Sequence, residues 1–224
     1  MNLPKIIHQI WIGPDPIPKE YQHYINMMRD MHPDWQHIIW GNKEIFEGEF
    51  KEDPFLSKWK DQINSEYLLQ PAFISDRARL LILEKMGGIY VDVDAKPIKS
   101  FNTILPILPE QCKLFAGWKW SGEHGYMADV TALGAIPDNP HLKFIIGRWG
   151  DGKYNHPLSG LHISNEILDR MDYDITLLHN DYFYSGHIKD RTLFLHDTDH
   201  RALSWTAMTP EWMLDQESDV EEDI

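Results

Sequence analysis

The 224-residue chain has almost no cysteine, no long hydrophobic run and few basic residues. Its one cysteine, Cys112, excludes an internal disulfide framework and fits a reducing compartment, so we expect a cytoplasmic protein. We expect neither a transmembrane segment nor a secretory signal, because the N-terminal MNLPKIIHQIW is short and mixed in character. With 21 Lys and Arg against 35 Asp and Glu, a formal net charge of −14 argues against nucleic acid as a partner.

The chain also lacks internal repeats, low-complexity segments and a recognisable interdomain linker. We therefore expect one folded domain over residues 1–212, long enough to bury a sizeable core. Residues 213–224 end in DQESDVEEDI, which carries six acids and predicts a solvated, disordered tail. Such a tail argues against strong attraction to anionic lipid, although a peripheral encounter with a membrane stays open.

Hydrophobic periodicity predicts an α/β protein with a mixed, mostly parallel sheet and helices on both faces. A strand, a helix and a strand open the chain, and a long helix over 71–86 has Pro71 in its first turn and Gly87 at its C-cap. Short helices are expected between 42 and 70. The remaining expected elements are the opening unit at 5–12, 18–33 and 35–40, later strands at 88–94, 113–118, 130–136, 175–179 and 192–196, and helices at 140–147 and 160–171.

The stretch SDRARLLILEKMGGIYVDVDA (75–95) places Asp92 and Asp94 at the end of an apolar strand. A lone Asp-x-Asp is most often a turn or a cap. Here two close carboxylates would repel each other unless a cation or proton lay between them, and open α/β sheets bind ligands beyond the carboxyl ends of their strands. Oxygen ligands suit Mn²⁺ or Mg²⁺, which bridge carboxylates to substrate phosphates. The pattern predicts a metal site of this kind.

PKIIHQIWIG, the stretch 75–95 and the late HRALSW together resemble the DXD-motif glycosyltransferases, in the right order from residue 4 to about 205. That family includes fungal α-mannosyltransferases, sphingolipid mannosyltransferases and bacterial capsule or lipopolysaccharide transferases, with the glucosyltransferase domains of clostridial toxins as distant relatives. The resemblance implies a GT-A-like single domain and a metal-dependent hexosyltransferase. It further implies a UDP- or GDP-sugar donor, a saccharide or lipid-linked acceptor, and usually retention of anomeric configuration.

The resemblance also implies a set of donor-binding residues. Trp11 would stack on the nucleotide base, while Asp76 and Arg79 would hold the ribose and the donor sugar. A plain core tryptophan and a surface ion pair at i,i+3 spacing are the competing interpretations. The full implied set is Trp11, Asp76, Arg79, Tyr90, Asp92, Ser204 and Trp205, the last two closing over the diphosphate.

For the metal, the resemblance implies that Asp94 binds directly and that Asp92 contacts the ribose or reaches the metal through water. The family usually has a histidine five or six residues before the late tryptophan, which His200 matches. Imidazole is a good ligand for transition metals. His196 is the alternative ligand, and the neighbouring aspartates at 197 and 199 could assist.

Residues 118–129, WKWSGEHGYMAD, lie between two expected strands and combine aromatic, polar and acidic side chains. Such a mixture suits sugars, although a loop with inward-packed tryptophans fits equally well. Asp129 is the candidate for a carboxylate beside the anomeric centre, so the candidate catalytic residues are Asp92, Asp94 and Asp129. The chain departs from the family at Ala132, near a frequent Asn, and at HPLSGLH, where Thr-Gly-Pro is common; both departures bear on which sugar is moved.

Two other functions compete with a transferase. In a phosphohydrolase or phosphotransferase the first Asp would attack phosphorus, but such motifs continue Asp-x-Asp-Gly-Thr and this chain reads DVDAKP. A catalytically inactive nucleotide-sugar-binding module would keep the ligands without turnover.

Overall fold

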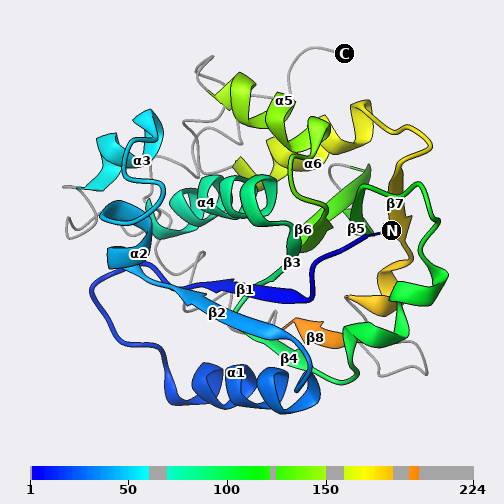
Figure 1. Ribbon diagram of the computed structural model, residues 1–224, viewed down its shortest axis with the longest axis horizontal. Coiled ribbons are helices and arrows are strands. Elements are labelled where there is room, and N and C mark those ends of the chain that lie inside the picture. The colour runs from blue at the N-terminus through cyan, green and yellow to red at the C-terminus, as the bar shows by residue number, and fades with distance from the viewer. Residues whose placement is uncertain (1, 61–69, 122–124, 150–158, 184–191, 197–224) are drawn as a thin grey trace, which may run out of the picture.

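The computed structural model describes residues 2–60, 70–121, 125–149, 159–183 and 192–196. Six strands form the central sheet in the order β2-β1-β3-β6-β5-β7, and two more form a small second sheet, β4-β8 (Figure 1). The strands are β1 (Ile6–Ile10), β2 (Gln36–Trp40), β3 (Gly88–Val91), β4 (Ala95–Pro97), β5 (Leu114–Ser121), β6 (Gly125–Ala135), β7 (Ile175–Leu178) and β8 (Phe194–His196).

Five strands of the central sheet run in one direction. β1 pairs in parallel with β2 and β3, β5 pairs in parallel with β7, and β6 lies antiparallel between β3 and β5. The expected mixed, mostly parallel sheet is therefore confirmed. This arrangement brings the carboxyl ends of β1, β3, β5 and β7 to the same edge as the amino end of β6.

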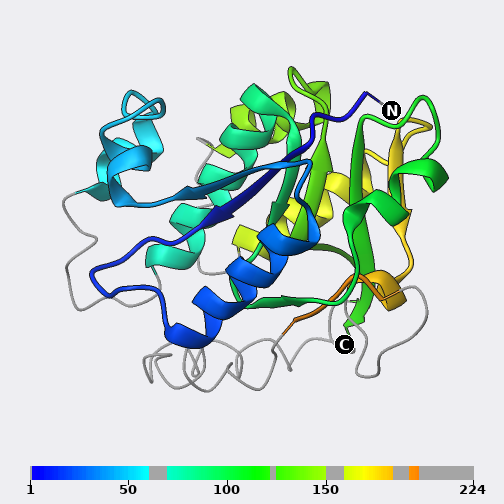
Figure 2. The same cartoon turned by 60° about the horizontal axis from the view of Figure 1, so that its bottom comes forward.

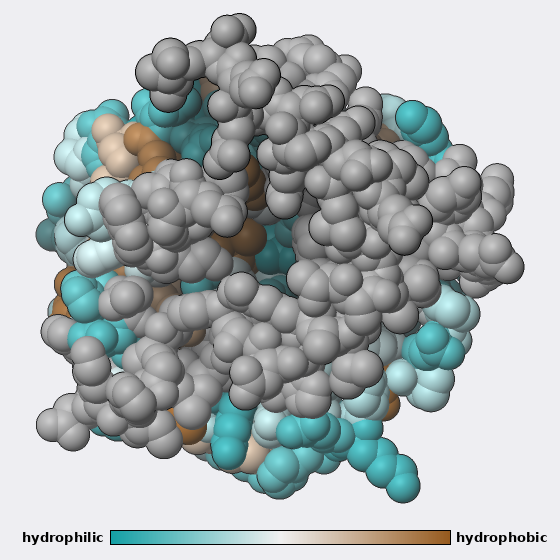
Figure 3. Space-filling view, turned by 180° about the vertical axis from the view of Figure 1, so that it is seen from behind, coloured by the Kyte–Doolittle hydropathy of each residue, from teal (hydrophilic) through white to brown (hydrophobic). Residues whose placement is uncertain are grey.

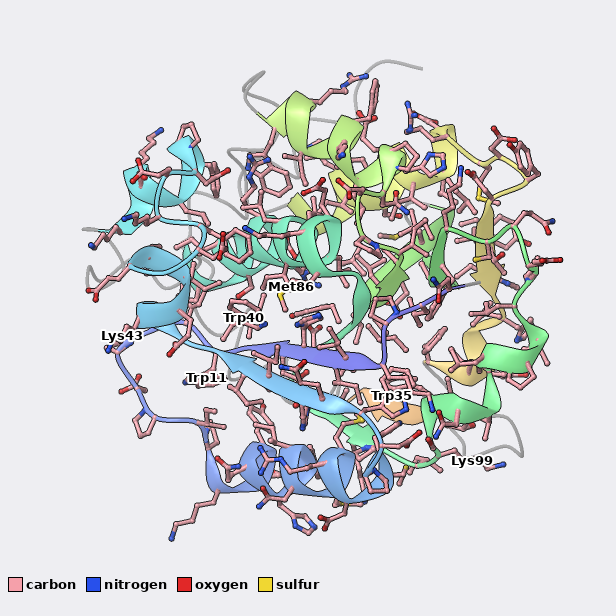
Figure 4. The ribbon with its side chains drawn as sticks, in the orientation of Figure 1. Trp11, Trp35, Trp40, Lys43, Met86 and Lys99 are labelled. Carbon is pink, nitrogen blue, oxygen red and sulfur yellow. The ribbon has the colours of Figure 1, made fainter. Side chains whose placement is uncertain are left out.

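Helices cover both faces of the sheet (Figures 1 and 2). α4 (Gln70–Met86), α5 (Pro140–Arg148) and α6 (Ser159–Asp169) lie on one side, and α1 (Lys19–Met31) lies with the small sheet on the other. α2 (Asn42–Phe46), α3 (Pro54–Trp59) and three short 3₁₀ turns complete the described elements. The core is correspondingly double: Trp40 belongs to the cluster on the α4 side and Trp35 to the cluster on the α1 side (Figure 4).

Two glycines make the tight connection from α4 into β3. Gly87 and Gly88 have φ of +64° and +96°, conformations that L side chains rarely adopt. A Cβ on Gly87 would also lie 2.8 Å from the Pro137 nitrogen, and one on Gly88 would lie 2.6 Å from the Ile6 carbonyl oxygen. The Gly-Gly pair therefore lets the long helix deliver β3 directly into the middle of the sheet.

The structure corrects two expectations. The strand expected over 88–94 ends at Val91, because Asp92 to Ala95 form a turn, and β4 then begins at Ala95. The segment 118–129 is not a loop between strands: β5 continues to Ser121 and β6 begins at Gly125.

Seen from behind, hydrophilic and hydrophobic residues lie side by side near the centre of the molecular surface (Figure 3). In the described part of the chain, no helix is both long and apolar enough to cross a membrane.

Candidate active site

The turn that carries both aspartates of the motif is held by backbone hydrogen bonds. The Ala95 N–H donates to the Asp92 carbonyl at 3.2 Å, which closes the turn, and the Asp92 N–H donates to the Thr131 carbonyl on β6 at 3.0 Å. The Gln9 side chain, fully buried on β1, donates its Nε2 to the same Asp92 carbonyl at 3.3 Å. Asp92 and Asp94 thus belong to a fixed turn at the carboxyl edge of the sheet and not to a continuing strand.

Arg79 is the centre of the charged cluster behind this turn. Its Nη2 lies 2.9 Å from Asp76 Oδ1 and 3.5 Å from Asp92 Oδ1, and its Nη1 donates to the Val130 carbonyl at 2.6 Å. The side chains of Arg79 and Asp76 are only 7% and 8% exposed, so the pair is not the surface ion pair that its i,i+3 spacing left open. α4 therefore presents a buried cation to the aspartate motif.

Tyr90 joins the arginine to the motif from β3. The Arg79 guanidinium carbon lies over the Tyr90 ring, 4.3 Å from the ring centroid. The Tyr90 hydroxyl donates to Asp92 Oδ1 at 2.5 Å. Burial raises the pKa of the Tyr90 phenol well above its ordinary value; Arg79 lowers it and Asp92 raises it further. Tyr90 consequently stays protonated and acts as a hydrogen-bond donor that fixes the Asp92 carboxylate.

Asp129 completes the cluster from the amino end of β6. It is 2% exposed, and its Oδ1 accepts the N–H of Thr131 at 3.0 Å. Burial alone lowers the pKa of the Arg79 guanidinium, but Tyr90, Asp76, Asp92 and Asp129 together raise it above its ordinary value. One electrostatic cluster therefore contains five of the residues that the sequence singled out for donor binding or catalysis: Asp76, Arg79, Tyr90, Asp92 and Asp129.

Trp11 lies just beyond the end of β1, beside the end of β2 (Figure 4). Its backbone N–H donates to the Trp40 carbonyl at 2.9 Å, and its indole Nε1 donates to the Asp15 carbonyl at 2.8 Å. The ring is partly exposed and meets Tyr21 edge-on at 6.2 Å between centroids, so it is not plain core. β1 is the immediate neighbour of β3, which places Trp11 at the same edge of the sheet as the aspartate turn.

The sequence alone missed two supports of this site. Gln9 was the detectable one, because it is one of two polar residues, with His8, in the strand IIHQI. Gly160 on α6 is less visible: a Cβ there would lie 3.6 Å from Asp76 Oδ2 and 3.4 Å from Val130. α6 therefore lies within van der Waals reach of the Asp76 carboxylate and helps to bury it.

Comparison with known proteins decides the family. Residues 18–111 match the family described as a glycosyltransferase sugar-binding region containing the DXD motif. The chain belongs to the DXD-motif glycosyltransferase family. Inositol phosphoceramide mannosyltransferase 1 of Schizosaccharomyces pombe is 32% identical over 164 residues, which cover 69% of this chain and 44% of that protein. Mannosyl phosphorylinositol ceramide synthase SUR1 of Saccharomyces cerevisiae is 34% identical over 93 residues, 41% of this chain and 22% of that protein. The chain thus spans less than half the length of these curated relatives.

Solved structures of glycosyltransferases share the fold. The PaToxG glycosyltransferase superposes with a TM-score of 0.55 at 20% identity, over 75% of this chain and 70% of that one. A glycosyltransferase involved in the glycosylation of the major capsid of PBCV-1 gives 0.52 at 11% identity, over 96% and 98% of the two chains. The expected GT-A fold in a single domain is therefore confirmed.

The described residues contain only part of the metal-ligand set that the sequence predicts. Asp92 and Asp94 supply carboxylates, and no group of three or more His, Cys, Asp or Glu suited to a metal occurs in the described part of the chain. His196 ends β8, and its backbone pairs with Ala95, the residue after Asp94. The predicted His200, Ser204 and Trp205 and the assisting aspartates at 197 and 199 lie outside the described residues.

Proposed function

We propose that the chain is a metal-dependent hexosyltransferase that moves a sugar from a UDP- or GDP-sugar to a saccharide or lipid-linked acceptor, with retention. The carrying observation is the buried Arg79 cluster behind the aspartate turn, at the sheet edge where α/β proteins bind ligands. The mannosyltransferase names of the curated relatives favour a hexosyl donor. Their inositol phosphoceramide acceptors make a glycolipid one candidate acceptor class.

The donor set fits a hard divalent cation. Two carboxylates on a fixed turn suit Mn²⁺ or Mg²⁺ that is shared with substrate phosphates. A bound cation of this kind would neutralise the negative charge of a departing nucleoside diphosphate. Asp94 would bind it directly, Asp92 would bind it through water or hold the ribose, and His200 or His196 would supply the imidazole.

The residues around the turn would position the donor. Arg79 and Tyr90 fix the Asp92 carboxylate, so this group would meet the ligand without reorganising. Trp11 would stack on the base at the end of β1. Asp129, held by the Thr131 N–H, would face the anomeric centre and stabilise positive charge that develops there. Ser204 and Trp205 would close over the diphosphate.

Thermal unfolding with UDP-, GDP- and TDP-sugars, each with Mn²⁺, Mg²⁺ or EDTA, tests the proposal directly. A donor at a hundred times its Kd should stabilise the native state by about 2.7 kcal/mol, and EDTA should remove that shift. Asp94→Asn should remove the metal-dependent shift and the turnover without changing the unfolding temperature of the free protein. Asp138→Asn is the matched control, because Asp138 is 86% exposed at the far end of β6 and Asn tolerates its φ of 56°.

The outcomes separate the competing functions. Nucleotide-sugar binding without turnover on any acceptor would favour an inactive binding module. Trapping by fluoroaluminate or beryllofluoride, with no donor shift, would instead favour a phosphohydrolase. A metal-dependent shift that survives Asp94→Asn would overturn the assignment of the metal site.

A further inference from the structure

Three rings meet where β5 and β7 reach the carboxyl edge of the sheet. Trp118 on β5 lies 5.3 Å from Tyr126 on β6 and 5.0 Å from His179 after β7, measured between ring centroids. Both contacts are edge-to-face, with interplanar angles of 68° and 80°. Tyr126 is 63% exposed and the His179 side chain is 44% exposed. We call these three residues the Trp118 platform.

The fold holds the platform in place. Trp118 pairs with Ala128 in the β5-β6 ladder. The Ala128 N–H in turn donates to Ser164 Oγ on α6 at 2.8 Å. His179 is fixed through Nδ1, which lies 3.2 Å from the Asp181 N–H nitrogen and 3.3 Å from its carboxylate. No hydrogen bond to the other ring nitrogen, Nε2, is found among the described residues. The rings are therefore preorganised, with a polar atom left at their edge.

Phe183 anchors the segment that carries His179. It is 1% exposed and packs against the backbone of Gly117, where a Cβ would lie 2.6 Å from its ring. Gly117 precedes Trp118 and lies opposite Asp129 in the ladder. One close contact therefore couples the platform to the strand pair that carries the candidate carboxylate.

The platform continues the edge that begins at the aspartate motif. β3, β6 and β5 are neighbours in that order, and strands in a sheet lie about 4.8 Å apart, so β5 is roughly 10 Å from β3. Asp129 on the intervening strand acts electrostatically on Arg79 and lies opposite the residue before Trp118. Because neighbouring residues of a strand point to opposite faces, the Trp118 platform and Asp129 lie on the two faces of the β5-β6 pair. A second substrate that reached a sugar held near Asp129 would extend around the sheet edge onto the Trp118 platform.

We propose that the Trp118 platform binds the neutral pyranose ring of a saccharide acceptor; this rests on the proposed transferase function. The axial C–H groups of a pyranose form an apolar face that gains from covering exposed aromatic surface. Its hydroxyl groups would bond to Nε2 of His179. Among the described residues, Asp181 (4% exposed) places a carboxylate against His179, and this charge disfavours a phosphorylated ring at the platform.

Direct binding of methyl pyranosides tests the proposal without donor, metal or turnover. Saturation-transfer NMR is run with methyl α-mannopyranoside, methyl α-glucopyranoside, methyl β-galactopyranoside and, as the anionic comparison, inositol monophosphate. Tyr126→Ala should weaken the preferred glycoside roughly fivefold to tenfold, the loss of one stacked ring. Tyr173→Ala is the matched control, because Tyr173 is 70% exposed and lies before the amino end of β7; it should leave binding unchanged.

His179→Ala supplies a second variant that removes the polar edge. It should weaken binding of the free pyranosides, because Nδ1 accepts the Asp181 N–H and Nε2 therefore carries the proton that it would donate to a sugar oxygen. Equal binding by Tyr126→Ala and the unaltered protein overturns the proposal, as does preference for inositol monophosphate or no binding by any pyranoside. The metal-dependent donor shift separates the two hypotheses: if it persists in Tyr126→Ala, a failure here concerns the acceptor alone, whereas its absence in the unaltered protein refutes the transferase function.

Discussion

Two buried arginines, two residues apart on α4, have closely similar surroundings and different consequences. Arg77 forms a 2.7 Å ion pair with Asp53, donates Nη1 to the Ile146 carbonyl at 2.8 Å, and lies over the Trp149 ring at 5.6 Å. Asp53 also accepts two backbone N–H groups at the start of α3 through its other oxygen. These three contacts of Arg77 belong to the packing of α3 and α5 on α4.

Arg79 repeats this pattern on the other side of the helix. It has an ion pair with Asp76, a bond to the Val130 carbonyl and a ring beneath it, Tyr90. The difference is an excess of carboxylates, because Asp92 and Asp129 also act on the same guanidinium. Arg77 forms an ion pair with one carboxylate, whereas Arg79 interacts with three, Asp76, Asp92 and Asp129. The site around Arg79 would bind a metal ion and the phosphates of a donor. The comparison teaches that the charge imbalance around a buried cation, more than its burial, marks the functional one.

Double variants should separate the two arginines most sharply. Arg77→Met should cost about 3–5 kcal/mol of unfolding free energy, because it leaves Asp53 buried and uncompensated. Asp53→Asn in the same chain should restore most of that loss, since Asn keeps the helix cap. Arg79→Met should cost a similar amount, but adding Asp76→Asn should restore little, because Asp92 and Asp129 remain. Urea unfolding of both cycles provides the measurement.

Equal recovery in the two cycles would break the comparison. It would mean that Arg79 balances Asp76 alone and that the remaining carboxylates do not depend on it. The circular dichroism spectrum of each variant is the control, because the free energies are comparable only if every chain keeps its secondary structure.

Conservative substitutions should move function more than stability. Arg79→Lys should reduce turnover and donor affinity by about a hundredfold, because an ammonium cannot reproduce the planar fork that reaches Asp76, Asp92 and Val130 together. Arg77→Lys should leave turnover within about twofold, since its partners are purely structural. Donor titration by calorimetry with Mn²⁺ and steady-state rates check both. Similar losses of donor affinity in the two variants would place the effect in the packing of α4.

The sequence predicted most elements of the fold for a simple reason. Strands such as Ile6–Ile10 and helices such as Gln70–Met86 are set by local periodicity and by Gly or Pro at their ends. The turn at Asp92 to Ala95 escaped prediction because the apolar and acidic alternation of VDVD also fits a strand, and the decisive bonds come from Thr131 and Gln9. Partners that are distant in the sequence therefore help to determine that Asp92 to Ala95 form a turn.

The candidate site likewise contains residues that the local sequence could predict and features that depend on distant contacts. Asp76, Arg79, Tyr90 and Asp92 lie in one continuous stretch, so a family resemblance could assign them, and the structure brings them together. That the Asp76–Arg79 pair would be buried depends on distant elements such as α6, which no local pattern reveals. The hairpin at 114–135 was likewise missed beyond Trp118, because its polar residues resemble a loop until they are paired across strands. The functional roles of the four residues in that continuous stretch stay predictions, as do those of Trp11, Asp94 and Asp129.

His8 extends the comparison to a buried base with no acid beside it, and its effect should be the smallest. It is fully buried, contacts the Gly87 carbonyl at 2.9 Å, and accepts the Trp40 indole N–H at 3.2 Å. Burial lowers the pKa of His8 from 6.5 to about 4, and the Gly87 carbonyl only partly offsets this. Burial also acts to lower the pKa of Arg79, but the carboxylates around Arg79 raise it above its ordinary value.

The depressed pKa of His8 makes stability depend on pH in a definite direction. Between its unfolded pKa of 6.5 and its folded pKa of about 4, the unfolded chain binds a proton that the folded chain excludes. The stabilisation is thus complete above pH 6.5 and should decline by about 2 kcal/mol between pH 6.5 and pH 5. His8→Gln, which can still accept the Trp40 bond, should flatten that decline in urea unfolding, and the exposed His23→Gln should not. An unchanged slope in His8→Gln would mean that His8 is protonated in the folded protein, and a buried charge without a carboxylate would then be tolerated here.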